Sequence, residues 1–257
     1  MFRPRVIPVL LLDGQALVKT IRFSAGKYLG DPVNAVKLFN DLRVDELVFL
    51  DITASRERRT ISTALIERIG GEANMPFAVG GGIRSVDDIR SAIASGAEKV
   101  ILNNAALVNP DFVRAAADAF GSSTIAVCLD VKRTMFAGTR VFSHASRKSS
   151  GRDPIEYAKS IEALGAGELI VQSVDRDGMM DGYDIPLIKA VSEAVSVPVV
   201  ALGGAGDLSD FASAHFDGFA SAVAAGSMFV YQSRKRGVLI NYPSREKIKQ
   251  VFTREGG

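Results

Sequence analysis

Eight short apolar runs alternate with amphipathic stretches along the chain. Each run is a continuous apolar block, which is typical of strands buried on both faces of a parallel sheet. The runs are Val6–Leu12, Leu47–Leu50, Phe77–Val79, Val100–Leu102, Ile125–Leu129, Leu169–Val171, Val197–Leu202 and Ala220–Ala225. This alternation in 257 residues predicts an α/β fold, a single (β/α)8 TIM barrel. A doubly wound open sheet, the structural alternative, would usually need fewer strands.

Helix starts are expected between the runs. Asp31-Pro32, Asn109-Pro110 and Asp153-Pro154 each combine an N-cap residue with a proline for the first helical position. Beyond Asp31, apolar residues recur on one helical face. These patterns place helices between the predicted strands, as a barrel requires.

The chain contains an internal repeat. Segments match at an offset of 122 residues, or of 119 residues near the N-terminus. The matching pairs are Glu46–Val48 with Glu168–Ile170, Gly81-Gly82 with Gly203-Gly204, Gly96-Ala97 with Gly218-Phe219, and Ile7–Leu11 with Ala126–Asp130. The repeat predicts two similar half-barrels of four βα units each. Because no linker interrupts the pattern, residues 1–257 are expected to form one barrel domain.

Glycine-rich segments follow equivalent strands of the two halves. Gly80–Ser85 follows the third strand and leads into a helix with Ser85 as its expected cap, while Gly203–Gly206 follows the seventh strand. Glycines let backbone N–H groups approach an anion, and a helix N-terminus favours negative charge. One such segment would more often be a turn. Two equivalent copies favour two phosphate sites, and hence a small molecule phosphorylated at both ends.

Acidic residues also lie where strands end. Asp130 ends the fifth strand, Asp51 ends the second, and Asp175 and Asp177 follow the sixth. Carboxylates in these positions can act as general acids or bases, although helix capping or loop solvation is the structural alternative. For Asp130 we favour function, whereas Asp51 stays open. The half-barrel copy of Asp130 is Leu11, so a reaction that needs a paired acid and base from these two positions is compromised.

The strand starts carry a second charged group. Arg5, Glu46, Lys99 and Glu168 stand at the starts of the first, second, fourth and sixth strands. They form either a structural network of salt bridges across the barrel floor or a gate whose ion pairs can open. The sequence leaves both interpretations open.

Composition narrows the classes of partner. The net charge is +2 and basic stretches are short, so no nucleic-acid partner is expected. The run Val6–Leu12 is too short to span a membrane, and we expect a soluble cytoplasmic protein. Cys128 is the only cysteine, and His144 and His215 are far apart, so neither a disulfide nor a metal site nor another cofactor is predicted.

Four segments together resemble one protein family. Asp45–Ser55, Val79–Ser85, Asp175–Asp184 and Gly203–Gly206 read DELVFLDITAS, VGGGIRS, DRDGMMDGYD and GGAG. They are similar to the cyclase subunit of imidazole glycerol phosphate synthase, the HisF type. The resemblance implies a barrel paired with a glutaminase (HisH-like) subunit. Ammonia from that subunit would pass a charged gate, cross the barrel and react at the far rim with a bisphosphorylated substrate. The products would be imidazole glycerol phosphate and an aminoimidazole carboxamide ribotide.

The resemblance and the residue patterns together give the expected site. Asp130 would be the catalytic acid or base, and the ammonia gate would be Arg5, Glu46, Lys99 and Glu168. The expected phosphate- and substrate-binding residues are Lys19, Asp51, Gly81, Gly82, Asn103, Asp177, Gly203, Gly204, Ala225 and Gly226.

One position departs from the family pattern. Leu11 stands where the paired catalytic aspartate is expected, and the segment Ser233–Arg245 is similar to a paralogous, WbuZ-type branch. That resemblance implies an ammonia-channelling subunit that works with a separate amidotransferase on acetamidino sugars of bacterial surface polysaccharides. We favour this function. The alternatives are an authentic cyclase subunit of histidine biosynthesis and a non-catalytic scaffold or sensor barrel, against which the retained gate residues argue.

Overall fold

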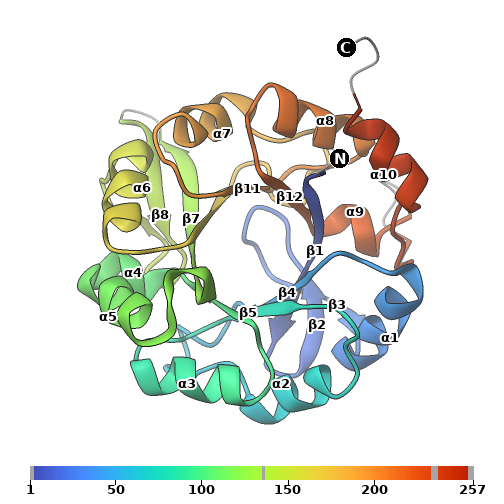
Figure 1. Ribbon diagram of the computed structural model, residues 1–257, viewed down its shortest axis with the longest axis horizontal. Coiled ribbons are helices and arrows are strands. Elements are labelled where there is room, and N and C mark those ends of the chain that lie inside the picture. Colours follow the sequence, from blue (N-terminus) through green and yellow to red (C-terminus); the bar gives the residue numbers. More distant parts are fainter. Residues whose placement is uncertain (1–2, 135–136, 233–236, 254–257) are drawn as a thin grey trace.

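The computed structural model, described here for residues 3–134, 137–232 and 237–253, is a closed parallel barrel (Figure 1). Each barrel strand pairs in parallel with its neighbours in chain order, and pairing of β12 with β1 closes the ring. The barrel strands are β1 (Arg5–Asp13), β4 (Leu47–Asp51), β5 (Phe77–Gly80), β6 (Lys99–Leu102), β7 (Ile125–Thr134), β10 (Glu168–Ser173), β11 (Val199–Leu202) and β12 (Ala222–Ala225). The predicted TIM barrel and all its strands are confirmed.

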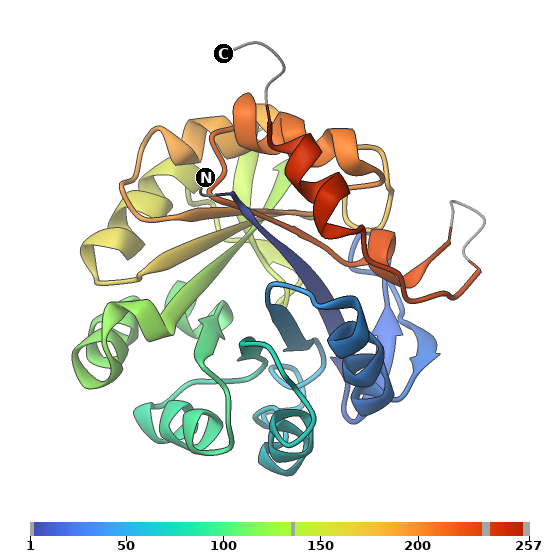
Figure 2. The same ribbon diagram turned by 45° about the vertical axis from the view of Figure 1, so that its right-hand side comes forward.

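Helices surround this ring on the outside, as Figures 1 and 2 show from two directions. They are α1 (Pro32–Leu42), α2 (Thr63–Gly70), α3 (Val86–Ala94), α4 (Asn104–Val108), α5 (Asp111–Phe120), α6 (Pro154–Ala163), α7 (Ile185–Ser192), α8 (Leu208–Phe216), α9 (Ser227–Val230) and α10 (Arg245–Val251), with a 3₁₀ turn at Ser122–Thr124. Within the described ranges, none of these helices has the length and apolar character needed to cross a membrane.

Most of the predicted helix starts are confirmed. The Asp31 side chain caps α1, Asp153 caps α6, and Ser85 forms a reciprocal capping box with Asp88 at α3. The expected cap at Asn109 is wrong. Asn109 instead ends α4, its N–H bonded to the Ala105 carbonyl at 2.8 Å, and α5 begins after Pro110 without a side-chain cap.

Two apolar cores hold the barrel together. The larger lies between the sheet and the helices, where Phe39, Phe49 and Phe211 are fully buried. The smaller fills the barrel interior, and several of its residues are small, among them Ala126 and Cys128. Side chains alternate between the two faces of a strand, so these two residues share the inward face of β7 with Asp130.

Both half-barrels begin with a long strand that continues beyond the ring into antiparallel structure. β1 pairs with β2 (Ala16–Lys19), which pairs with β3 (Lys27–Gly30). β7 pairs with β8 (Gly138–Ser143), which pairs with β9 (Lys148–Ser149). The sequence indicates only a long polar connection after the fifth strand, but buried Val131 and Val141 lie opposite each other there and favour strand pairing.

Candidate functional site

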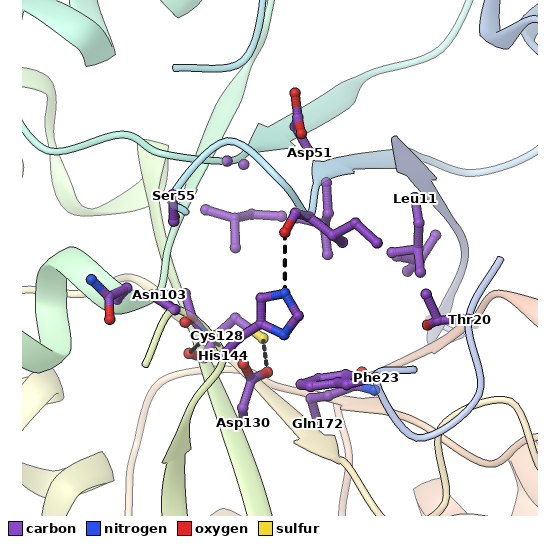
Figure 3. Close-up of a pocket in the computed structure, with 18 of the residues that line it drawn as sticks. Leu11, Thr20, Phe23, Asp51, Ser55, Asn103, Cys128, Asp130, His144 and Gln172 are labelled. Atoms are coloured by element: carbon purple, nitrogen blue, oxygen red, sulfur yellow. Dashed lines mark hydrogen bonds between the residues drawn. The ribbon is translucent and has the colours of Figure 1, made fainter. Parts of the chain in front are cut away.

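A hollow of about 1020 Å³, including its open mouth, lies at the carboxyl ends of the barrel strands (Figure 3). In this fold, that end of the barrel holds the active site. Of the predicted rim residues, those that line the hollow are Lys19, Asp51, Gly81, Gly82, Asn103, Asp130, Asp177 and Gly226. Gly203, Gly204 and Ala225 lie outside this lining.

Asp130 is buried in the hollow with neutral partners. The Asn103 amide donates to Oδ2 at 3.1 Å, and the Cys128 thiol lies 3.6 Å from Oδ1. Asn103 also donates to the Cys128 carbonyl at 2.9 Å, which fixes its orientation. Burial raises the pKa of Asp130 to about 7, although both hydrogen bonds lower it. Among the described residues no cation pairs with this carboxyl, so it can donate or accept a proton near neutral pH.

The half-barrel copy of Asp130 is apolar. Leu11 lines the same hollow, opposite Leu50 on β4 and Val18 on β2. The nearby Asp13 does not replace the missing carboxyl, because it lies outside the lining and accepts a hydrogen bond from the Thr53 hydroxyl at 3.1 Å. At these two symmetry-related positions the hollow therefore has one carboxyl, that of Asp130, where the internal repeat would allow two.

Asp51 belongs to a different network. Its buried carboxylate pairs with Arg59 and accepts hydrogen bonds from the N–H groups of Thr53 and Ala54, both at 3.1 Å. These contacts organise the loop after β4. Asp51 thus has a structural role, which the sequence left open as the alternative to catalysis. A ligand-binding role for Asp51 stays a prediction.

The first glycine segment is held tightly under that loop. A Cβ at Gly81 would lie 2.7 Å from the Asp51 Cβ, and one at Gly82 only 1.9 Å from the Arg59 carbonyl oxygen. Both residues also have positive φ angles, +133° and +67°. Glycine is therefore required both by the close contacts and by the backbone conformation. The N–H groups of Gly82 and Ile83 have no partner in the described chain, as an anion site needs.

Lys19 lies beside the second predicted phosphate site. Its ammonium pairs with Asp177 at 3.1 Å, and Thr20 donates to the same carboxylate at 3.1 Å. A Cβ at Gly226 would come within 3.5 Å of the Lys19 ammonium. The Ser227 hydroxyl next to it is buried without a partner among the described residues. A cation therefore lies beside this turn, and a buried hydroxyl without a partner in the described chain follows it in sequence.

The four charged residues at the strand starts form one cluster. Arg5 pairs with both Glu46 and Glu168, and Lys99 pairs with Glu168 at 3.1 Å. Burial raises the pKa of Glu46 although Arg5 and Lys99 oppose it, while for Arg5 burial lowers the pKa but the two glutamates outweigh it and raise it overall. This geometry is compatible with both a structural network and a gate.

A narrow cavity lies inside the barrel between the two ends. Glu46 and Glu168 line it on the cluster side, and the space open to a water centre is about 10 Å³. That is about the room one water needs. It shares four apolar lining residues with the hollow at the rim: Val9, Leu50, Ile101 and Leu202.

Gln172 and His144 are two polar lining residues among those that the sequence-based list did not include. Gln172 is buried at the end of β10, in register with Asp130. Its position at a strand end, with a polar side chain after an apolar run, was a usable signal. His144 was not predictable, because it reaches the hollow from the turn of the β8–β9 hairpin. Its Nε2 donates to the Ile52 carbonyl at 3.1 Å, and its ring meets Phe23 edge-on at 5.1 Å.

Comparison with known proteins gives consistent matches over nearly the whole chain. A family model described as "Histidine biosynthesis protein" matches residues 5–235. A provisionally named imidazole glycerol phosphate synthase subunit, hisF2 of Pseudomonas aeruginosa, is 42% identical over 96% of this chain and 99% of its own length. Similarly named proteins of Vibrio vulnificus (hisF3) and Leptospira interrogans are 43% and 41% identical, each over 98% of this chain and 97% and 100% of their own lengths.

Proposed function

The chain belongs to the histidine biosynthesis protein family, and we propose that it is the HisF-type barrel subunit of a glutamine-dependent synthase. In this function a separate glutaminase (HisH-like) subunit docks at the strand starts and releases ammonia there. The ammonia crosses the barrel interior and reacts with a phosphorylated acceptor at the rim.

A single arrangement carries this proposal. The charged cluster of Arg5, Glu46, Lys99 and Glu168, the narrow apolar cavity and the rim hollow lie in series along the barrel. Neutral ammonia is small enough for a space of about one water, and an apolar wall disfavours its charged form. Lys19 and the free N–H groups of Gly82 and Ile83 offer donors for phosphate at the rim.

The relatives' names favour cyclisation to imidazole glycerol phosphate as the rim reaction. In this candidate reaction Asp130 acts without a second acid–base group. Its pKa of about 7 allows it both to donate and to accept a proton near neutral pH.

Leu11 favours a second candidate, delivery of ammonia for amidation of another acceptor. A sugar precursor of a bacterial surface polysaccharide, amidated with a further amidotransferase, fits the resemblance of the segment Ser233–Arg245, which lies partly outside the described residues. Removing one member of an acid–base pair typically lowers a rate by about 10²–10⁴-fold.

The decisive measurement is turnover of the bisphosphorylated histidine-pathway substrate with saturating ammonium. Robust turnover by the wild type supports cyclisation through Asp130. If the wild type is inactive but Leu11→Asp gains activity, the wild-type rim has a substrate site that lacks only one carboxylate. That result supports the second candidate. Leu12→Asp would be a poor control because Leu12 is fully buried, whereas Leu38→Asp, at a half-exposed site on α1, controls for the added charge.

A further inference from the structure

The outer flank of the rim carries a groove that the proposed function does not use. This α4 groove lies between α4 and residues 143–150 of the β8–β9 hairpin, and its volume is about 780 Å³ including the open mouth. The Ser143 hydroxyl donates to the Asn104 side chain at 3.1 Å and joins the two walls. Of the described lining residues, only Asn104 and Ala145 also line the hollow, so most of the groove is a surface beside it.

One wall of the α4 groove is apolar. Leu107 and Val108, at the end of α4, line it, and Val108 is 75% exposed. A single exposed valine would need no explanation by itself. Here it borders a concavity, and a chain that entered the groove would bury its apolar surface.

The opposite wall is polar and borders an open strand edge. β9 is the last strand of its sheet in the described chain, so its outer edge is free to pair with a further extended segment. The ammonium of Lys148, on β9, lines the groove and has no ion-pair partner among the described residues. No carboxylate belongs to the described lining.

The hairpin that forms this wall is strongly basic. The segment 132–152 contains no acidic residue and six basic ones: Lys132, Arg133, Arg140, Arg147, Lys148 and Arg152. Within the described ranges, only Arg140 has a carboxylate at ion-pair distance, that of Asp153 at 3.8 Å. Lys132 and Arg152 lie over aromatic rings, and Arg147 donates to a backbone carbonyl. Such a concentration of one charge attracts an acidic partner.

Neither a phosphate in the hollow nor a lipid surface explains this arrangement as well as a protein segment does. None of the six basic residues lines the hollow, so they do not contact a ligand there. A flat membrane surface would meet the basic hairpin but would not fill a concave groove. An extended chain would fill it, because its side chains alternate between two faces and can present apolar and acidic groups to different walls.

We propose that the α4 groove docks an extended acidic segment of a second protein, distinct from the glutaminase. Its backbone pairs with the edge of β9, an apolar side chain packs on Leu107 and Val108, and its carboxylates face Lys148 and the basic hairpin. The inference rests on the proposed function only for the purpose of this docking. In the second candidate, docking would bring the further amidotransferase to the mouth of the hollow.

Fluorescence anisotropy with a labelled acidic peptide tests the charged wall. The probe is Glu-Leu-Glu-Leu-Glu, titrated with the full chain at pH 7.5 and low salt, and Gln-Leu-Gln-Leu-Gln is its neutral match. The wild type should bind the acidic peptide at least about tenfold more tightly than the neutral one. Lys148→Glu should weaken binding of the acidic peptide by about tenfold, because an attractive contact becomes repulsive. Lys37→Glu, at an exposed site on α1, makes the same charge change elsewhere and should stay within about twofold.

The apolar wall has its own variant. Val108→Ser should weaken binding of both peptides by a similar factor, about fivefold, because it removes apolar contact and no charge. Leu38→Ser, at a half-exposed site on α1, is the matched control. Lys148→Gln removes the charge without reversing it, and its affinity for the acidic peptide should lie between those of the wild type and Lys148→Glu.

Four results would overturn the proposal. They are equal wild-type affinities for the two peptides, equal weakening by Lys148→Glu and Lys37→Glu, no weakening by Val108→Ser, and release of the acidic peptide by inorganic phosphate beyond the effect of sodium chloride at the same ionic strength. The last result would place the peptide in the hollow. Binding to phosphatidylglycerol vesicles that Lys148→Glu abolishes, with no binding of either peptide, would assign the surface to a membrane and also overturn the proposal. None of these titrations contains glutamine, ammonium or a glutaminase, so a failure of ammonia transfer would contradict the proposed function alone.

Discussion

Glu46 and Glu168 at one end of the barrel and Asp130 at the other are all buried carboxyl groups, but their partners differ. At the strand starts, Glu46 and Glu168 share Arg5 and Lys99 in one ion-pair cluster. At the carboxyl ends, Asp130 has only an amide and a thiol as partners in the described chain. The cluster can keep its charges, whereas the rim acid is held near the point of proton exchange. Such a difference is typical of a structural or gating network at one end and reactive chemistry at the other.

The largest effect should come from breaking the cluster at its centre. Glu168→Ala leaves Lys99 unpaired and removes one of the two carboxylates around Arg5. We expect a loss of about 3–5 kcal/mol in the free energy of unfolding, measured by urea denaturation. Glu156→Ala, which removes an exposed partner of Lys159, is the matched control and should change it by less than about 0.5 kcal/mol. Equal effects in both variants would mean that the cluster is not a buried network.

The rim acid should give a smaller change of opposite sign. The pKa of Asp130 is about 7 when folded, against about 3.9 when unfolded, so the folded state holds a proton that the unfolded state has released. Stability is therefore lost as pH rises from about 4 to about 7. Asp130→Asn removes this penalty and should raise the free energy of unfolding by at most about 4 kcal/mol at pH 8.

Most of that gain should disappear at pH 5, where the wild-type carboxyl is already protonated in the folded state. Thermal unfolding of both proteins at the two pH values measures the difference. A gain that is the same at pH 5 and pH 8 would mean that Asp130 does not titrate in this window. Asp153→Asn, at the exposed cap of α6, controls for loss of a carboxylate elsewhere.

Substitution of Lys99 should have the smallest effect on stability, and it distinguishes a gate from a structural network. It makes one ion pair and its side chain is about a quarter exposed, so Lys99→Ala should cost less than about 1 kcal/mol. If the cluster is a gate, the variant will change glutamine-dependent activity with the glutaminase partner while activity with free ammonium stays near that of the wild type. Equal, unchanged rates in both assays would leave the cluster without a gating role.

The candidate site was predictable where strand ends and glycine repeats define it. Asp130, Asn103 and Gly82 stand directly after apolar runs, and parallel strands of a barrel bring those ends to one rim. Asp51 shows the limit of that reasoning. It stands in an equivalent place, but Arg59 and the loop after β4 occupy its carboxylate. A strand-end acid is thus located by sequence, while its availability depends on which loop folds over it.

The sequence by itself determined the barrel, its two-fold repeat and the loss of the second carboxyl at Leu11, because strand periodicity and chain order decide which residues reach each end. Only the tertiary structure decided the environment of each group. It joined Arg5 to two glutamates distant in sequence, left Asp130 without a cation, and brought His144 into the hollow on a hairpin. Burial, charge compensation and unused hydrogen-bonding atoms are properties of packed neighbours, and the order of residues along the chain does not contain them.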